Sequence, residues 1–270
     1  MEKIRAHKTT IRRTKSPVSI AIIGKGRLGT SYALAIKKTK QYKLHSHLPA
    51  RSKSFAPLSK VGGPDVLFII CKDASISAVA KKAIAKCGQN LTLVVHSAGS
   101  LPSSILPDHE GVGRLMLHPL QTFAEPSADL FKHITFGVES DEKNALQFAE
   151  QFCKALSAHR LIYLSESELP LYHATAVIAA NFITLLGGAI EKLSTGLKLK
   201  PIEFKQSLTP LMTKSLANVL NYRSKDILTG PMARNDIKTI EKNKAALQAS
   251  GNKVIAELYE AFHKLAKELK

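Results

Sequence analysis

Three glycines follow a short apolar segment near the start of the chain, in the order Gly24-Lys-Gly-Arg-Leu-Gly29. The first glycine allows a sharp turn, the second lets the backbone approach a pyrophosphate, and the third lets a helix pack closely on a sheet. Residues 18–23 are typical of a buried parallel strand, and residues 28–38 carry apolar side chains at helical spacing. A phosphate would bind at the positive N-terminus of that helix. This pattern predicts a dinucleotide site, and an ordinary glycine turn is the alternative. The residues of the predicted site are Gly24, Lys25, Gly26, Arg27, Leu28 and Gly29.

The second strand is expected over residues 42–48, and the loop that follows it indicates which dinucleotide would bind. A site specific for NAD offers Asp or Glu to the ribose roughly 20 residues after the turn. The loop from Pro49 to Lys53 has no acidic residue. Arg51, Ser52 and Lys53 could instead bind a 2′-phosphate through charge-assisted hydrogen bonds. The pattern favours NADP over NAD, and a solvated basic loop is the other interpretation.

Polar residues follow three further expected strands, 65–71, 91–95 and 114–117. They are Asp73, Ser97 and His118, and ligands of open α/β sheets bind outside the carboxyl ends of the strands. Asp73 either caps the following helix, as Ser75 could, or lies beside the cofactor groove. His118 is the first candidate for an acid or base, because the ordinary pKa of histidine lies near neutrality. A histidine that only bonds to the turn at Pro119 is the alternative.

The second half of the chain has no convincing strand after those expected at 134–139 and 160–164. Ser165 to Glu168 has the spacing of a capping box, and residues 169–190 form a long apolar helix. His173 and Asn181 would share one face of that helix, where they either bond within the core or line a site. The run is long enough to span a bilayer, but it is too polar, so we expect a helix buried on most sides, as at a subunit interface. Further helices are expected over 202–222, 237–249 and 253–267.

These elements predict an α/β protein: an N-terminal Rossmann domain with a doubly wound, mostly parallel sheet, followed by an all-α domain. The expected boundaries are a basic leader over 1–16, an NAD(P)-binding domain over 17–166 and a helical domain over 167–270. The leader is basic and poor in acid, as a transit sequence would also be.

Composition narrows the classes of partner. The 39 basic and 21 acidic residues give a net charge of +18, which favours anionic ligands without choosing among them. The chain has no Trp, and its basic residues are not interleaved with aromatics, so specific nucleic-acid binding has little support. The 3 cysteines are too far apart for a metal knuckle, and their odd number argues against a disulfide scaffold. We expect a cytoplasmic protein without a structural metal.

The combination resembles a known family, the Rossmann-like proteins with a DUF2520 domain, a branch of the 6-phosphogluconate dehydrogenase-like reductases. The matching residues are Gly24 to Gly29, Asp73, His96-Ser97, His118-Pro119-Leu120-Gln121, His173 with Asn181, and Leu228 to Asp236. The resemblance implies an N-terminal NAD(P)-binding domain, a helical domain often used for dimerisation, and a substrate cleft between them. Its wider relatives include ketopantoate reductase, pyrroline-carboxylate reductase and prephenate dehydrogenase.

Two departures limit what the resemblance implies. The β-hydroxyacid dehydrogenases place a catalytic Lys four residues before the Asn, where this chain has Val177. The usual Arg-Gly-Asp is Arg234-Asn235-Asp236, and Asn tolerates the left-handed backbone that this turn requires.

We expect an NADP(H)-dependent oxidoreductase that transfers a hydride to a carbonyl or imine of a small anionic molecule. Ser97 and His173 are alternatives to His118 for the proton, Asn181 would orient the substrate oxygen, and Arg234 would bind its carboxylate or phosphate, unless Arg234 pins Asp236 instead. The expected assembly is a homodimer through the helical domain, without membrane or specific nucleic acid. The alternative is a non-catalytic NADP(H)-binding sensor or scaffold, which the missing lysine at Val177 favours.

Overall fold

The computed structural model describes residues 17–60 and 62–269, so the expected basic leader lies outside the described residues. Within this range the chain divides into two compact units, with the division between Val177 and Ile178. The sequence pattern places the boundary at residue 166, where the strands end. The first helix after the strands is part of the first unit, where Leu169 is buried and the Tyr172 hydroxyl lies against Gly137.

A seven-stranded sheet forms the centre of the first unit, in the order β2-β1-β3-β4-β5-β6-β7. All neighbouring strands are parallel except β5 and β6, which are antiparallel. The strands are β1 Val18–Ile23, β2 Tyr42–Leu48, β3 Val66–Ile69, β4 Leu93–His96, β5 Gly113–Pro119, β6 Thr135–Glu139 and β7 Arg160–Tyr163. The chain is therefore Rossmann-like, with a helical region after a mostly parallel sheet, as the sequence predicts.

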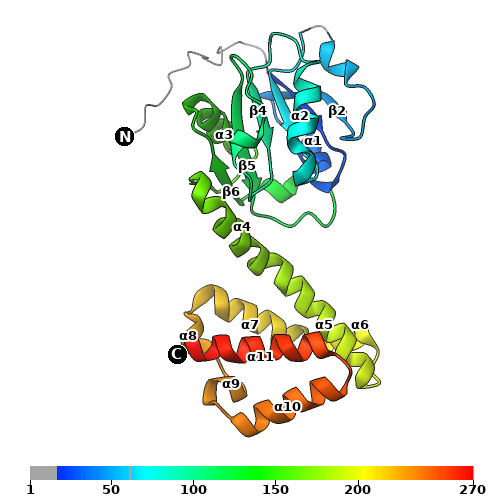
Figure 1. Ribbon diagram of the computed structural model, residues 1–270, viewed down its shortest axis with the longest axis vertical. Coiled ribbons are helices and arrows are strands. Elements are labelled where there is room, and N and C mark those ends of the chain that lie inside the picture. The colour runs from blue at the N-terminus through cyan, green and yellow to red at the C-terminus, as the bar shows by residue number, and fades with distance from the viewer. Residues whose placement is uncertain (1–16, 61, 270) are drawn as a thin grey trace. The chain divides into compact units, whose positions relative to one another are not determined.

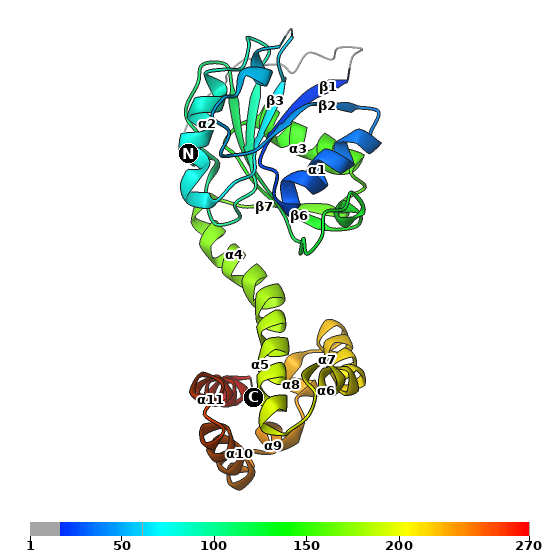
Figure 2. The ribbon, with the colours of Figure 1, turned by 90° about the vertical axis from the view of Figure 1, so that its right-hand side faces the viewer.

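Helices cover both faces of the sheet. One face packs against α1 (Arg27–Lys38) and α3 (Lys143–Ala155), and the other against α2 (Ile76–Ile84), so the two hydrophobic cores lie on opposite sides. Figure 2 shows α2 on one side of the strands and α1 and α3 on the other. Because β1 lies between β2 and β3, the chain runs from β1 to β2 on one side and then returns past β1 to β3 on the other. This reversal creates the switch point where such sheets bind ligands.

Aromatic side chains fill the core beneath α1 and α3. The Tyr32 ring stacks on Phe131 with centroids 4.6 Å apart and lies against Phe68 and Phe152. Tyr32 is fully buried, and burial raises the pKa of its hydroxyl far above the ordinary value. This packing fixes α1, and with it the glycine turn that precedes α1.

The second unit is helical (Figure 1). A helical run begins in the first unit as α4 (Leu169–Val177), passes through a π-helical turn (Ile178–Phe182) and continues as α5 (Ile183–Gly196). Helix α5 packs against α6, α10 packs against α11, and α9 lies against both of the latter. The remaining helices are α6 Pro201–Ser207, α7 Thr209–Asn221, α8 Ser224–Ile227, α9 Gly230–Arg234, α10 Ile237–Ala249 and α11 Lys253–Glu268.

The apolar helical run is not buried within the single chain, so its expected burial at a subunit interface stays a prediction. Leu171, Ile178 and Leu185 each expose more than half of their surface. By length and composition, the run Glu166–Gly196 is the one candidate for a membrane span among the described residues. This is weak evidence, because core helices of other proteins have the same length and composition.

Candidate dinucleotide and imidazole site

The glycine turn closes tightly on its neighbours. Gly24 has φ +136°, and a Cβ there would overlap the carbonyl oxygen of Ile70 at the end of β3. A Cβ at Gly29 would overlap the carbonyl oxygen of Gly24, so the closest contact of Gly29 is with the turn rather than with the sheet. Gly26 has no neighbour within 4 Å of a Cβ position, which leaves open space beside its backbone. The turn therefore presents bare backbone at the switch point.

The N-terminus of α1 faces this space without a capping side chain. Its N-cap is Gly26, which makes no side-chain hydrogen bond, and the first turn has no acidic residue. Lys25 and Arg27 are exposed, and Leu28 is half-buried. The first amides of α1 and the positive end of its dipole are thus available to an anion.

His47 supports the turn from the neighbouring strand, a role that the sequence-based reasoning missed. Its Nε2 lies 2.8 Å from the carbonyl oxygen of Gly24 and, since a carbonyl only accepts, Nε2 carries the hydrogen. A polar residue at the end of the second strand was the available signal.

The basic loop after β2 provides two free cationic side chains. Arg51 and Lys53 are exposed, and neither makes an ion pair with another residue that the structure describes. Ser52 donates its hydroxyl hydrogen to the carbonyl oxygen of Ser54 at 2.6 Å, so its donor is already used inside the loop. Arg51 and Lys53 are the better candidates for binding a phosphate.

Asp73 begins a short 3-10 turn ahead of α2 and is exposed. The N-cap of this turn is Lys72 and that of α2 is Ser75, and neither N-cap residue makes a capping side-chain hydrogen bond. The expected capping by Asp73 or Ser75 is therefore absent, and Asp73 stays a candidate for the cofactor groove.

His96 at the end of β4 has a structural role. It is fully buried; its Nδ1 accepts the Ala98 N–H at 3.2 Å, and its Nε2 donates to the Pro102 carbonyl at 3.1 Å. Burial lowers the pKa of His96 to about 4, which the bond to Pro102 opposes. The neutral ring shapes the loop that carries Ser97, whose hydroxyl lies 3.5 Å from that of Tyr32.

His118 lies at the end of β5, where the sequence predicts it, and its partner is Tyr172. The His118 Nδ1 lies 2.9 Å from the Tyr172 hydroxyl, and the ring centroids of His118 and His173 are 5.6 Å apart. Burial, followed by the nearby His173 and His96, lowers the pKa of His118 to about 4. The expectation that His118 titrates near neutrality does not hold, because the ring is removed from water beside two other imidazoles.

Two glycines make room for these rings. A Cβ at Gly99 would lie 2.8 Å from the His118 Nδ1 and 2.9 Å from the His173 Nδ1. Gly137 is the cross-strand partner of His118, and a Cβ there would overlap the Tyr172 hydroxyl. The sequence-based reasoning missed Gly99, Gly137 and Tyr172, although a glycine inside a strand often marks such a close approach.

Helix α4 carries Tyr172 and His173 to this cluster. The predicted capping box is present, since the Ser165 N–H donates to Glu168 Oε2 at 2.7 Å and the Ser165 side chain accepts in return. Leu169 is fully buried and anchors the first turn. The His173 Nδ1 is buried and has no hydrogen-bond partner among the described residues. The structure thus brings His118, His173 and Tyr172 together at the strand ends.

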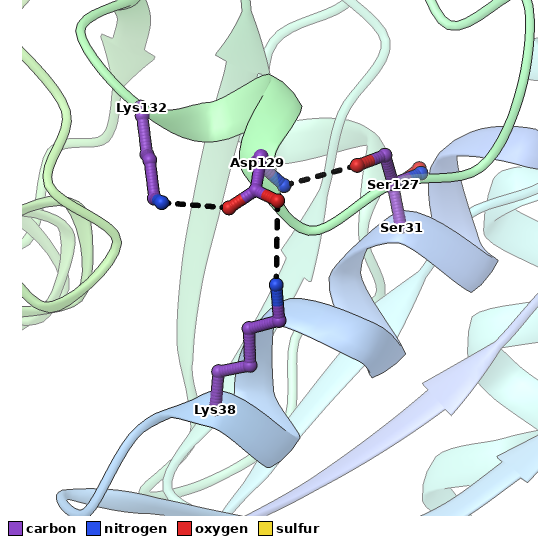
Figure 3. A network of polar contacts seen from close by, with 5 residues as sticks. All are labelled: Ser31, Lys38, Ser127, Asp129 and Lys132. Atoms are coloured by element: carbon purple, nitrogen blue, oxygen red, sulfur yellow. Dashed lines mark hydrogen bonds and ion pairs between the residues drawn. The ribbon is translucent and has the colours of Figure 1, made fainter.

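The loop after His118 is anchored to α1. Figure 3 shows Asp129 between Lys38 of α1 and Lys132, at 3.4 and 2.7 Å. The Ser127 N–H donates to Ser31 Oγ at 3.1 Å, and Ser31 is fully buried on α1. Because the ion pairs are exposed and screened, the buried bond to Ser31 is the stronger anchor, worth about 1 kcal/mol.

The two site residues predicted in the second unit, Asn181 and Arg234, are not part of the imidazole cluster. Asn181 lies within the π-helical turn, so the α-helical spacing that would place it on one face with His173 is interrupted, and Asn181 is exposed. Arg234 is also exposed. Asn235 has the expected left-handed backbone, with φ 53°.

Asp236 caps α10 by accepting from the Thr239 N–H at 3.1 Å and the Thr239 hydroxyl at 2.7 Å. These bonds hold the pKa of Asp236 below its usual range, with a smaller effect of Arg234. The described residues show no ion pair between Arg234 and Asp236. No group of three or more His, Cys, Asp or Glu suited to a metal occurs among them either.

Known structures share this fold. A candidate NADP oxidoreductase from Bacteroides fragilis aligns over 94% of this chain and 99% of its own, with TM-score 0.76 and 20% identity. A Thermotoga maritima protein aligns over 93% and 97%, with TM-score 0.68 and 25% identity. Pyrroline carboxylate reductase from Plasmodium falciparum, solved with NADP bound, aligns over 94% and 98%, with TM-score 0.59 and 14% identity. A search among curated proteins gives no match.

The fold and the bare glycine turn at the switch point define a Rossmann-like protein with a helical C-terminal region. Residues 134–266 match the family model DUF2520, a domain of unknown function. This match agrees with the resemblance to Rossmann-like proteins with a DUF2520 domain that the residues at the strand ends indicate.

Proposed function

We propose that this protein is an NADP(H)-dependent oxidoreductase that transfers a hydride to a carbonyl or imine of a small anionic substrate. The observation that supports it best is that the bare glycine turn and the imidazole cluster occupy the same edge of the sheet. Strands β1, β3, β4 and β5 are parallel, so Gly24, Ser97 and His118 lie at or just after carboxyl ends that meet at that edge.

The residues present fit a dinucleotide. The open space at Gly26 and the uncapped N-terminus of α1 suit a pyrophosphate, and Arg51 and Lys53 suit a 2′-phosphate. Related folds include one protein described as an NADP oxidoreductase and one reductase solved with NADP bound, which supports the same cofactor class here. A bound nicotinamide would supply the hydride.

The protein must then polarise the acceptor group and exclude water. His118 is the residue that we place at this step, in its neutral form, with Ser97 and His173 as further hydrogen-bonding groups at the same strand ends. A neutral imidazole polarises a carbonyl through its N–H, as it does in other enzymes that lower the pKa of a histidine. Asn181 and Arg234 are proposed to contact the substrate, with Arg234 binding its anionic group.

A His118→Ala variant tests this role. Turnover of NADPH with an accepted keto acid or cyclic imine should fall by roughly a hundredfold, while the Kd for NADPH stays within about twofold of wild type. His109→Ala, at an exposed histidine elsewhere in the first unit, is the matched control and should leave both unchanged. Unchanged turnover in the His118 variant would remove it from the mechanism.

A non-catalytic NADP(H) sensor is the second candidate, favoured by Val177 at the position of the superfamily lysine. Binding of NADPH without oxidation across a broad panel of keto acids and imines would support the sensor. Oxidation that depends on His118 would exclude it.

The second unit is proposed to form a homodimer. Among the described hydrophobic residues beyond Val177, only Ile240, Ala256 and Ala266 are buried, whereas Leu185 and Leu220 expose more than half of their surface. A second copy would cover this apolar surface. Sedimentation should give a dimer for the wild type and a monomer for Leu185→Lys, and a monomeric wild type would contradict the proposal.

We further expect a soluble cytoplasmic protein whose binding to nucleic acid is weak and lost in salt.

A further inference from the structure

Tyr172 contacts His118 in a way that restricts the chemistry of the imidazole. The Tyr172 hydroxyl lies 2.9 Å from Nδ1, the only ring nitrogen of His118 with a hydrogen bond among the described residues. The two rings meet edge to face, with centroids 5.6 Å apart and an interplanar angle of 87°. The contact at Nδ1 places the hydroxyl at the edge of the imidazole, where the nitrogen lone pair lies.

Both partners are neutral at pH 7, which leaves two directions for the hydrogen bond. Burial raises the pKa of Tyr172 to about 12, so the phenol keeps its hydrogen. Burial and the neighbouring His173 and His96 lower the pKa of His118 to about 4, so the ring holds one hydrogen. Either the phenol donates to a bare Nδ1, or an Nδ1–H donates to the phenol oxygen.

The surroundings favour donation by the phenol. The Gly137 backbone lies against the Tyr172 hydroxyl and lowers its pKa, which is the effect of a backbone N–H directed toward the phenol oxygen. Among the described residues, the His118 Nδ1 is the group that makes a hydrogen bond with this hydroxyl. The phenol O–H is also the stronger acid of the two groups, and the imidazole nitrogen is the better acceptor.

We infer that Tyr172 donates its hydroxyl hydrogen to Nδ1 of His118 and thereby holds His118 as the tautomer with its hydrogen on Nε2. Tyr172 is a positioning residue, and the N–H at Nε2 is the group that His118 offers to a substrate oxygen or nitrogen. The catalytic part of this inference depends on the proposed function, whereas the tautomer does not.

The backbone around the pair is built for this contact. Gly137 is opposite His118 in the antiparallel pair of β5 and β6, and its missing side chain is what admits the Tyr172 hydroxyl. On the other side, Gly99 lies against His118 Nδ1 and Cγ, so a larger residue would push the imidazole out of place. The hydrogen bond therefore depends on two bare backbone positions and on the first turn of α4.

Nitrogen chemical shifts of the full-length chain test the tautomer directly. With ¹⁵N-labelled histidine at pH 7, His118, assigned by the signals lost in His118→Gln, should show a bare Nδ1 and a protonated Nε2. In Tyr172→Phe the preference should be lost, with both nitrogens moving toward averaged shifts. Tyr163→Phe, which removes an exposed hydroxyl bonded to Glu150 at 2.7 Å, is the matched control and should leave His118 unchanged.

A hydrogen on Nδ1 in the wild type, or His118 shifts that do not respond to Tyr172→Phe, would overturn the inference. Should Tyr172→Phe fail to fold, as judged by circular dichroism, Gly137→Ala provides a second variant that displaces the same hydroxyl and should give the same spectrum.

Activity separates this inference from the proposed function. Where the wild type oxidises NADPH with a substrate, Tyr172→Phe should lower kcat about tenfold and leave the Kd for NADPH unchanged. An unchanged kcat would overturn the positioning role. A wild type that shows the Nε2 tautomer but no turnover on any substrate would end the proposed function and leave the hydrogen-bond assignment standing.

Discussion

Gly24 lies so close to the end of β3 that a Cβ would overlap the carbonyl oxygen of Ile70. The turn after β1 and the end of β3 are therefore held together by backbone alone, at the switch point of the sheet. Gly26, two residues further on, has open space beside it. The two glycines thus have separable roles, the first in the fold and the second in binding.

Because Gly24 is needed for the fold, Gly24→Ala should lose much of its stability. The variant combines an overlap with backbone and a φ of +136°, which an alanine rarely adopts, so the free energy of unfolding should fall by at least about 2 kcal/mol. Gly26→Ala, at φ −70°, should change it by less than about 1 kcal/mol. Urea denaturation followed by circular dichroism measures both, and equal losses would contradict the separation.

Cofactor selection should depend on Arg51. Because the loop has no acid and Arg51 makes no ion pair among the described residues, Arg51→Ala should weaken NADPH binding by roughly ten- to a hundredfold. Binding of NADH, which lacks the 2′-phosphate, should be nearly unchanged. Titration calorimetry with both nucleotides gives the ratio, and a parallel loss for NADPH and NADH would show that Arg51 does not contact that phosphate.

The close packing around His118 and His173 should not tolerate a side chain at Gly99. In Gly99→Ala the new Cβ would press on His118 and His173, which should cost about 1 to 3 kcal/mol of stability and lower any turnover. Gly187→Ala on α5 is the control, since its Cβ has no neighbour within 4 Å and alanine favours helix there. Thermal melts of the two variants should shift in opposite directions, and an unaltered melt for Gly99→Ala would be inconsistent with the packing.

The buried histidines predict a pH dependence of stability. His96 and His118 have folded pKa values of about 4, below the ordinary 6.5, so the unfolded chain binds protons more readily between these values. Stability should therefore be complete above about pH 6.5 and fall as the pH drops toward 4. Thermal midpoints across this range measure the slope, which should be smaller in His96→Gln. A wild-type midpoint that stays constant from pH 6.5 to 4.5 would contradict the neutral burial of both rings.

The sequence predicts most of the sheet because the strands are continuous apolar runs. The bounds expected for Val18–Ile23 and Tyr42–Leu48 are confirmed, and the capping box at Ser165 is present. The imidazole cluster is harder to predict from the sequence, because Tyr172 contacts His118 only through the pairing of β5 with β6 and the missing side chain at Gly137. The spacing of residues along the chain does not indicate which strands pair.

Other differences arise from burial and from helix geometry. The pKa of His118 depends on desolvation by residues distant in sequence, which a motif does not show. The π-helical turn at Ile178–Phe182 adds a register change that the apolar pattern hides, so the spacing of His173 and Asn181 is misleading. The exposure of α5 shows that apolar composition alone does not distinguish a helix buried in its own chain from one left exposed.

Calorimetric titration of NADPH into the wild type and Gly26→Ala decides whether a dinucleotide binds at the glycine turn. A site at this turn predicts binding to the wild type and a loss of at least about tenfold in Gly26→Ala, because a methyl group would occupy the space that the pyrophosphate needs. The melting temperature of the variant should stay near that of the wild type. No binding of NADPH or NADH to the wild type, or equal affinity in the folded variant, would contradict a dinucleotide site at this turn.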